Sequence, residues 1–115
     1  MKVLVVEDEF LVREVISEDL REAGFEVIEA ATGVAAIERC EQHDPDVLVT
    51  DIRLPGNLDG WDVAELCRET KPWLPVIYAT AYSDQTRMVP GAVLFKKPYR
   101  PSQILSAIEQ LTRAA

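Results

Sequence analysis

Basic residues are scarce in this sequence relative to acidic ones. Its 115 residues include 12 Lys and Arg against 20 Asp and Glu, so the formal net charge at pH 7 is −8. Binding to phosphates requires clustered Lys and Arg, and an anionic membrane surface attracts the same side chains. We therefore expect no direct binding to nucleic acid and no attraction to such membranes.

Long apolar runs are also absent from the sequence. The longest, such as residues 3–6, span about four residues, whereas a helix that crosses a bilayer needs about 20. The first run follows Met1 and Lys2 and ends at Glu7, so it lacks the extended apolar core of a signal peptide. We expect no membrane insertion and a cytoplasmic location.

Cysteine is rare as well, since the chain has only 2, Cys40 and Cys67, which lie far apart in helical patterns. A disulfide framework or a zinc site would require more ligands at closer spacing. We therefore expect both cysteines to be small buried hydrophobic residues in a reduced cytosolic setting.

Glycine and proline are too few for a disordered or repetitive chain. There are 5 Gly and 7 Pro, with 48% hydrophobic and 28% charged residues, which is a globular composition. A chain of this length forms one domain and buries roughly two thirds of the surface that it exposes when unfolded. We expect a single domain over residues 1–115, with no linker and no attached effector domain.

Two hydrophobic periods alternate along the chain. Short apolar segments predict strands, and apolar residues at intervals of three and four predict helices between them. The predicted strands are residues 3–6, 25–29, 47–49, 76–79 and 93–95. The second is more polar than the others, which is typical of a strand near a sheet edge. This order predicts an α/β fold, a doubly wound five-stranded parallel sheet with helices on both faces.

Polar side chains follow four of the five predicted strands. Glu7 and Asp8 come after the first, Asp51 after the third, Thr80 after the fourth and Lys97 after the fifth. The carboxyl ends of parallel strands lie at one edge of a sheet, where open sheets bind ligands. We therefore expect three carboxylates, a hydroxyl and an ammonium group to converge there.

The chemistry of this set favours a phosphoryl group and a metal ion. Three adjacent carboxylates repel one another unless a cation lies between them, and Mg²⁺ prefers such oxygen ligands and shares its shell with phosphate. With Mg²⁺ bound, a carboxylate can act as the nucleophile towards phosphorus. We expect Asp51 to be that nucleophile, since it comes from the middle of the sheet. Lys97 and Thr80 are suited to bind the phosphoryl oxygens.

Each of these residues also has an ordinary structural interpretation. Glu7 and Asp8 suit the first turn of a helix, where the helix dipole favours acidic side chains. Asp51 and Thr80 suit turns, and Lys97 suits a solvated surface. The combination of suitable residue types at four strand ends is what favours a functional site.

Five short segments form a set that occurs in a known family. They are residues 5–9 (VVEDE), 49–55 (VTDIRLP), 59–60 (DG), 79–81 (ATA) and 97–98 (KP). As a set they resemble the receiver domain of two-component response regulators, and the resemblance extends over essentially the whole chain. It implies a flavodoxin-like (CheY-like) sheet with strand order 2-1-3-4-5.

The resemblance also implies a role for the site. Asp51 would accept a phosphoryl group from a histidine kinase or a histidine phosphotransfer protein, and Thr80 and Lys97 would bind that group. The domain would catalyse its own phosphotransfer and dephosphorylation, without being an enzyme for other substrates. It would signal by protein–protein interaction with an output protein that the sequence does not identify. The Lys97–Pro98 peptide bond is expected to be cis.

A magnesium site is part of the same resemblance. By carry-over from the family, Asp8 and Asp51 ligate Mg²⁺ directly and Glu7 acts through water. The main-chain carbonyl of Arg53 completes the ligands that the protein supplies.

Three features depart from the usual receiver pattern, one of which is that the loop over residues 56–60 is one residue longer than its commonest form. Receivers usually carry Tyr or Phe at the position of Leu94, so the aromatic of the usual threonine–aromatic switch is absent. The segment between Thr80 and Lys97 is short and contains Pro90–Gly91, which predicts a shortened fourth helix. Residues 78–82 (YATAY) resemble the signature of a subgroup of stand-alone, single-domain receivers that lack this aromatic.

Three other functions compete with a phosphoacceptor switch. A phosphatase of the haloacid dehalogenase type has a second Asp two residues after its nucleophile, where this chain has Arg53, and it usually has a cap domain. A binding module that has lost phosphorylation would not need the full acidic set. Flavin binding on the same fold would need a phosphate-binding loop after the first strand, which is not present.

Overall fold

The computed structural model describes residues 1–81 and 87–113. Within these ranges, strands and helices alternate as the sequence predicts. In chain order they are β1 (Lys2–Val6), α1 (Phe10–Glu22), β2 (Glu26–Ala30), α2 (Gly33–His43), β3 (Val47–Thr50), α3 (Gly60–Thr70), β4 (Val76–Thr80), β5 (Val93–Lys96) and α4 (Pro101–Thr112).

The strands form one parallel sheet in the order β2-β1-β3-β4-β5. This is the predicted fold class and strand order, and both are confirmed. Every residue of β3 and β4 is buried, whereas β2 and β5 are partly exposed at the two edges. The more polar second strand is therefore an edge strand, as its composition predicts.

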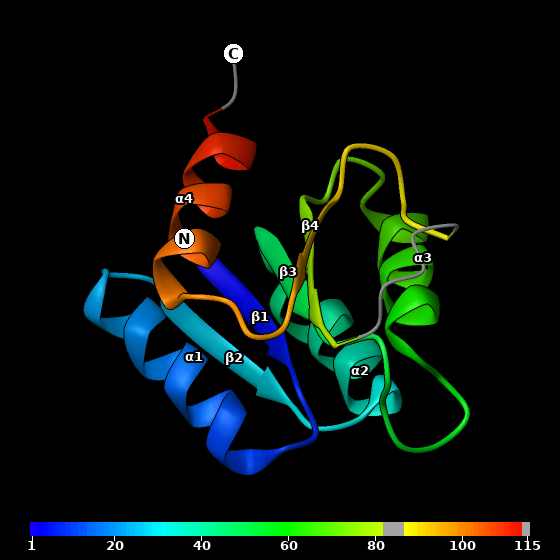
Figure 1. Ribbon diagram of the computed structural model, residues 1–115. Helices are drawn as coiled ribbons and strands as arrows, with labels where there is room; N and C mark the ends of the chain where they lie inside the picture. The colour runs from blue at the N-terminus through cyan, green and yellow to red at the C-terminus, as the bar shows by residue number, and fades with distance from the viewer. Residues whose placement is uncertain (82–86, 114–115) are drawn as a thin grey trace.

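Helices cover both faces of the sheet, as Figure 1 shows. The α2 and α3 helices pack on one face, where Leu4, Leu48 and Tyr78 are among the fully buried side chains. The α1 and α4 helices pack on the other face, against β-strand residues such as Val5 and Ile77. Successive side chains of a strand point to opposite faces of the sheet, so alternate residues of each strand contribute to two separate cores.

Side-chain caps fix the starts of α2 and α3. The Thr32 hydroxyl accepts a hydrogen bond from the Ala35 amide at 3.1 Å and begins α2. Asp59 and Asp62 form a capping box at α3, with each carboxylate accepting from the other residue's amide at 2.9 and 3.0 Å. Such caps satisfy amide groups that have no partner within the helix.

The connection between β4 and β5 contains a bend and turns rather than a helix over its described residues, 81 and 87–92. The predicted shortened helix falls partly on residues 82–86, which lie outside the described residues, as does Tyr82 of the YATAY signature. Side chains from elsewhere hold the described part. The Arg68 guanidinium donates to the Pro90 carbonyl at 2.7 Å, and the buried Tyr78 hydroxyl accepts from the Val89 amide at 3.3 Å.

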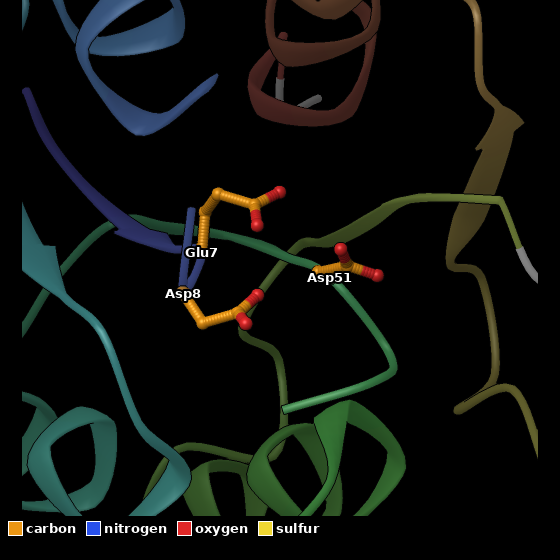
Figure 2. Close-up of side chains that lie close together, drawn as sticks. All are labelled: Glu7, Asp8 and Asp51. Atoms are coloured by element: carbon orange, nitrogen blue, oxygen red, sulfur yellow. The ribbon is translucent and has the colours of Figure 1, made fainter. Parts of the chain in front are cut away.

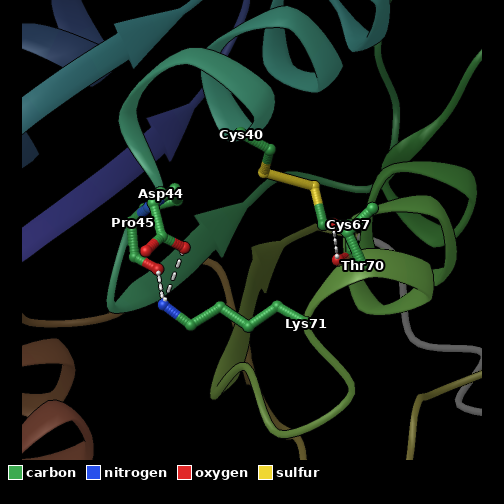
Figure 3. The surroundings of a disulfide bond; sticks show 6 residues. All are labelled: Cys40, Asp44, Pro45, Cys67, Thr70 and Lys71. Carbon is green, nitrogen blue, oxygen red and sulfur yellow. Dashed lines mark hydrogen bonds and ion pairs between the residues drawn. A yellow bond between two sulfur atoms is a disulfide. The ribbon is translucent and has the colours of Figure 1, made fainter.

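The prediction of two free, separate cysteines is wrong. Cys40 of α2 and Cys67 of α3 form a disulfide bond, with their Cα atoms 6.3 Å apart (Figure 3). Both residues lie on the helix faces that meet over the same side of the sheet. Separation along the sequence gives no information about which helices become neighbours, and this is why the sequence-based expectation failed.

None of the helices in the described ranges has the length and apolar character that crossing a bilayer requires.

Candidate functional site

Three carboxylates meet beside the ends of two neighbouring strands. Glu7 and Asp8 follow β1, and Asp51 follows β3, which pairs with β1 so that Val6 lies opposite Thr50. Each of the three offers a carboxylate oxygen, and these oxygens all lie within 4.8 Å of one another. Figure 2 shows the group gathered at this edge of the sheet. The predicted convergence of the acidic residues is therefore observed.

Backbone hydrogen bonds fix this group by extending the sheet one residue beyond the strands. The Asp51 amide donates to the Val6 carbonyl at 2.9 Å, and the Glu7 amide donates to the Ala30 carbonyl at 3.0 Å. The Asp51 carboxylate in turn accepts from the Ile52 amide at 2.6 Å. Glu7 and Asp51 are consequently held in place by the sheet itself.

Lys97, the residue just after β5, reaches the carboxylates. Its Nζ atom donates to Asp51 Oδ2 and to Glu7 Oε1, both at 3.0 Å. The Lys97 amide donates to the Thr80 carbonyl at 2.7 Å, and the following peptide bond, Lys97–Pro98, is cis, as the resemblance implies. The predicted ammonium group is thus beside the predicted nucleophile.

Burial and charge together set the protonation of this cluster. The Glu7 side chain is 3% exposed, and burial raises the pKa of its carboxyl to about 6 even though it accepts hydrogen bonds from the Glu9 amide and Lys97. Burial disfavours the charge of Lys97. Its hydrogen bonds to Asp51 and Glu7 outweigh that effect and hold the Lys97 pKa above its ordinary value. The site is arranged to stabilise positive charge next to Asp51.

Thr80 and Arg53 also lie at this edge of the sheet. Thr80 is the last residue of β4 and is 1% exposed, and it pairs in register with Lys96. Arg53 is exposed in the loop that follows Asp51. The predicted contacts of Thr80 with a phosphoryl group and of the Arg53 carbonyl with a metal ion stay predictions.

Two residues to which the sequence analysis gave no role in the site support it. Arg13 donates to the Glu7 carbonyl at 2.7 Å and to the Glu29 carboxylate at 3.1 Å, so it anchors the backbone beside the cluster. Gly60 donates its amide to the Ile52 carbonyl at 2.7 Å, and a Cβ atom there would overlap the Asp51 carbonyl oxygen. The Asp-Gly pair of the sequence was a signal for this close approach, whereas Arg13 gave none.

Comparison with known proteins assigns the family. The sequence profile described as "Response regulator receiver domain" matches residues 3–109. The chain belongs to this family. The transcriptional regulatory protein PhoP for alkaline phosphatase synthesis, from Bacillus subtilis, is 31% identical over 97% of this chain and 48% of its own length. PdtaR, a transcriptional regulatory protein of Mycobacterium tuberculosis, is 35% identical over 94% of this chain and 55% of its own length.

A solved structure gives the same result for the fold. The crystal structure of a response regulator receiver protein from Sinorhizobium medicae superimposes with a TM-score of 0.94 and 31% identity, covering 99% of this chain and 95% of that one. The chain spans about half the length of the curated relatives it matches. It is a receiver domain of two-component signalling, and the phosphoacceptor role is that of its family.

An apolar groove opens beside Lys97 on the receiver domain. It has a volume of about 600 Å³ and lies between α1 and the segment that follows β5. Leu11 and Val15 of α1 line it and are 75% and 55% exposed, respectively. Pro98 and Tyr99 line the opposite side. An apolar surface of this kind, next to the cluster that contains Asp51, is suited to contact a protein partner.

Proposed function

We propose that Asp51 is the phosphoacceptor of this receiver domain and that it takes its phosphoryl group from a phosphohistidine. The donor is a histidine kinase or a histidine phosphotransfer protein. The observation that carries the proposal is the position of Lys97 Nζ, 3.0 Å from both Asp51 Oδ2 and Glu7 Oε1. A carboxylate nucleophile and a fixed cation for the incoming phosphoryl oxygens are therefore already side by side.

The transfer needs no other covalent chemistry from the protein. An Asp51 carboxylate oxygen attacks phosphorus, the bond from phosphorus to the histidine nitrogen breaks, and its electron pair returns to the imidazole. The product is an acyl phosphate on Asp51. Lys97 neutralises one phosphoryl oxygen and the Thr80 hydroxyl donates to another, so both stabilise the charge that is spread over these oxygens.

The acidic cluster fits Mg²⁺. All three side chains offer oxygen ligands, which a hard divalent cation prefers, and their carboxylate oxygens lie within 4.8 Å of one another. Asp8, Asp51 and the Arg53 carbonyl would hold the ion directly, and Glu7 would hold it through water. When bound, the ion supplies further positive charge to the phosphoryl oxygens. Lys97 contributes one positive charge beside three carboxylates, and a bound divalent cation would offset more of their mutual repulsion.

The same arrangement serves the removal of the phosphoryl group. A water molecule that attacks phosphorus would restore the Asp51 carboxylate, again with Lys97 and Thr80 bound to the phosphoryl oxygens. The domain acts on its own phosphoryl group in this account and does not process other substrates. We place its output in the cytoplasm, as a change in affinity for another protein, and the net charge of −8 disfavours direct binding to nucleic acid.

The groove beside Lys97 is the docking surface that we assign to the phosphohistidine donor. Leu11 and Val15 expose apolar side chains there, and Lys97 borders both the groove and the acidic cluster. A donor helix that covers this groove would carry its histidine to the edge where Asp51 lies. Burial of the two apolar side chains would stabilise that complex.

Mass spectrometry of the intact domain tests the proposal. We expect incubation with Mg²⁺ and acetyl phosphate to add one phosphoryl group to the wild type and none to Asp51→Asn. The matched control is Asp44→Asn, an exposed aspartate with a positive φ that asparagine also tolerates. The proposal is wrong if Asp51→Asn is still phosphorylated, or if the wild type is not phosphorylated by any donor at saturating Mg²⁺.

A further inference from the structure

The β3–α3 loop, residues 51–59, is held between the first turns of two helices. The α3 helix begins at Gly60, whose amide donates to the Ile52 carbonyl at 2.7 Å and whose Cα lies against the Asp51 carbonyl. The α2 helix begins at Gly33, where an added Cβ would lie 2.6 Å from the Leu58 Cβ and 2.7 Å from its carbonyl oxygen. The position of this loop therefore depends on how α2 and α3 sit relative to each other.

The two cysteines of the chain join these same helices further along. Figure 3 shows the Cys40–Cys67 disulfide bridging α2 and α3. Cys67 is 4% exposed and packs in the core on this face, whereas Cys40 is partly exposed. The disulfide joins α2 and α3 near their C-terminal ends. Gly33 and Gly60 pack against the β3–α3 loop at the N-terminal ends of the same two helices.

We propose that Cys40 and Cys67 form a redox modification site, at which a disulfide and a dithiol interconvert, and that the oxidised form restrains the β3–α3 loop. The inference concerns the cysteine pair and does not depend on phosphorylation of Asp51. It differs from a permanent structural disulfide in one respect, because it requires both redox states to be folded.

The exchange partner is a small thiol and its disulfide, such as glutathione. In the oxidising direction a thiolate of the pair attacks the small disulfide, forms a mixed disulfide and releases one small thiol. The second cysteine thiolate then attacks the mixed disulfide, which closes the Cys40–Cys67 bond and releases a second small thiol. Two electrons pass from the protein to the small disulfide, and two small thiols reverse the sequence. Cys40 is the sulfur that an incoming thiolate reaches, because Cys67 is buried.

A second connection between the helices is independent of the thiols. Lys71, just beyond α3, donates its Nζ to the Pro45 carbonyl at 2.7 Å and to the Asp44 carboxylate at 3.2 Å (Figure 3). Asp44 caps the end of α2. These contacts keep the helix ends together after reduction, so opening the disulfide can loosen the β3–α3 loop without separating the helices.

The first arm of the test is a redox titration of the whole domain in mixtures of reduced and oxidised glutathione. Free thiols are trapped by alkylation and counted by intact mass. We expect a reversible transition between no free thiol and two, with melting temperatures that differ by on the order of 10 °C. The proposal fails if the two thiols stay free in oxidised glutathione, or if the reduced protein is unfolded.

The second arm is hydrogen exchange in the two redox states. Reduction should speed exchange of the amides of residues 52–60 by about tenfold, and leave those of β1 and α4 nearly unchanged apart from global unfolding. Cys40→Ala should exchange like the reduced wild type in both buffers, and Cys67→Ala provides a second variant if the first fails to fold. Equal exchange of residues 52–60 in both states would overturn the proposed restraint.

Discussion

The two faces of the sheet are covered by helix pairs of different character. On one face α2 and α3 are joined by the Cys40–Cys67 disulfide and by the contacts of Lys71, and both helices abut the loop that follows Asp51. On the other face α1 and α4 leave a groove lined by the exposed side chains of Leu11 and Val15. We propose that the two faces have different roles: the first supports Asp51, the proposed phosphoacceptor, and the second offers a surface to a protein partner.

The largest effect is expected where the supporting face meets Asp51. In Gly60→Ala the added methyl group overlaps the Asp51 carbonyl and the backbone of Ile52, neither of which can move without disturbing the site. We expect the free energy of unfolding to fall by about 3 kcal/mol, as measured by urea denaturation. The control is Glu69→Ala, on the exposed side of α3, which should change the free energy of unfolding by less than about 0.5 kcal/mol. Equal losses in the two variants would contradict the role given to this contact.

A change on the groove face should alter partner recognition without altering stability. We expect Leu11→Asp and Val15→Asp each to slow phosphoryl transfer from a histidine kinase by about tenfold, since each removes apolar surface from the interface. Phosphorylation by acetyl phosphate should be unchanged. Val34→Asp is the matched control, because Val34 is similarly exposed, at 58%, but lies in the first turn of α2, which covers the other face. If Val34→Asp slows transfer as much as the α1 variants do, the histidine kinase does not dock specifically on the groove face.

The smallest effect is expected from the ion pairs on the supporting face. Arg87 donates to Glu65 at 2.8 Å and to Asp62 at 3.1 Å, and thereby ties the β4–β5 connection to α3. Its side chain is 43% exposed, so solvent screens these pairs. We expect Arg87→Ala to lower the free energy of unfolding by about 0.5–1 kcal/mol at low salt and by less at 1 M salt. Arg21→Ala, which removes a single pair with Glu29 on the α1 face, should cost less.

The sequence predicts the fold and most of the site for clear physical reasons. Continuous apolar runs identify strands that are covered on both faces, and the carboxyl ends of parallel strands share one edge, so Glu7, Asp51 and Lys97 had to converge if the strands paired in parallel. The cis bond before Pro98 followed from the resemblance to the receiver family. The strand predictions and the convergence of the site need only local pattern and the rules of sheet topology.

Other features depend on which surfaces meet in three dimensions. The helical period identifies α1, but it does not reveal that Leu11 and Val15 remain exposed beside the segment after β5. Likewise, it places Cys40 and Cys67 on inward faces of their helices without indicating that these faces adjoin. The support that Arg13 gives to the Glu7 backbone is a single long-range contact, which no sequence period encodes.

The central claim is that Asp51 receives the phosphoryl group within the cluster formed by Glu7, Asp8 and Lys97. It is tested most directly by a crystal structure of the domain with Mg²⁺ and beryllofluoride, which mimics a phosphoryl group. We expect beryllium bonded to an Asp51 carboxylate oxygen, Lys97 Nζ in contact with a fluoride, and the metal ion bound by Asp8. Beryllofluoride on another residue, or a metal ion bound away from these carboxylates, would contradict the account.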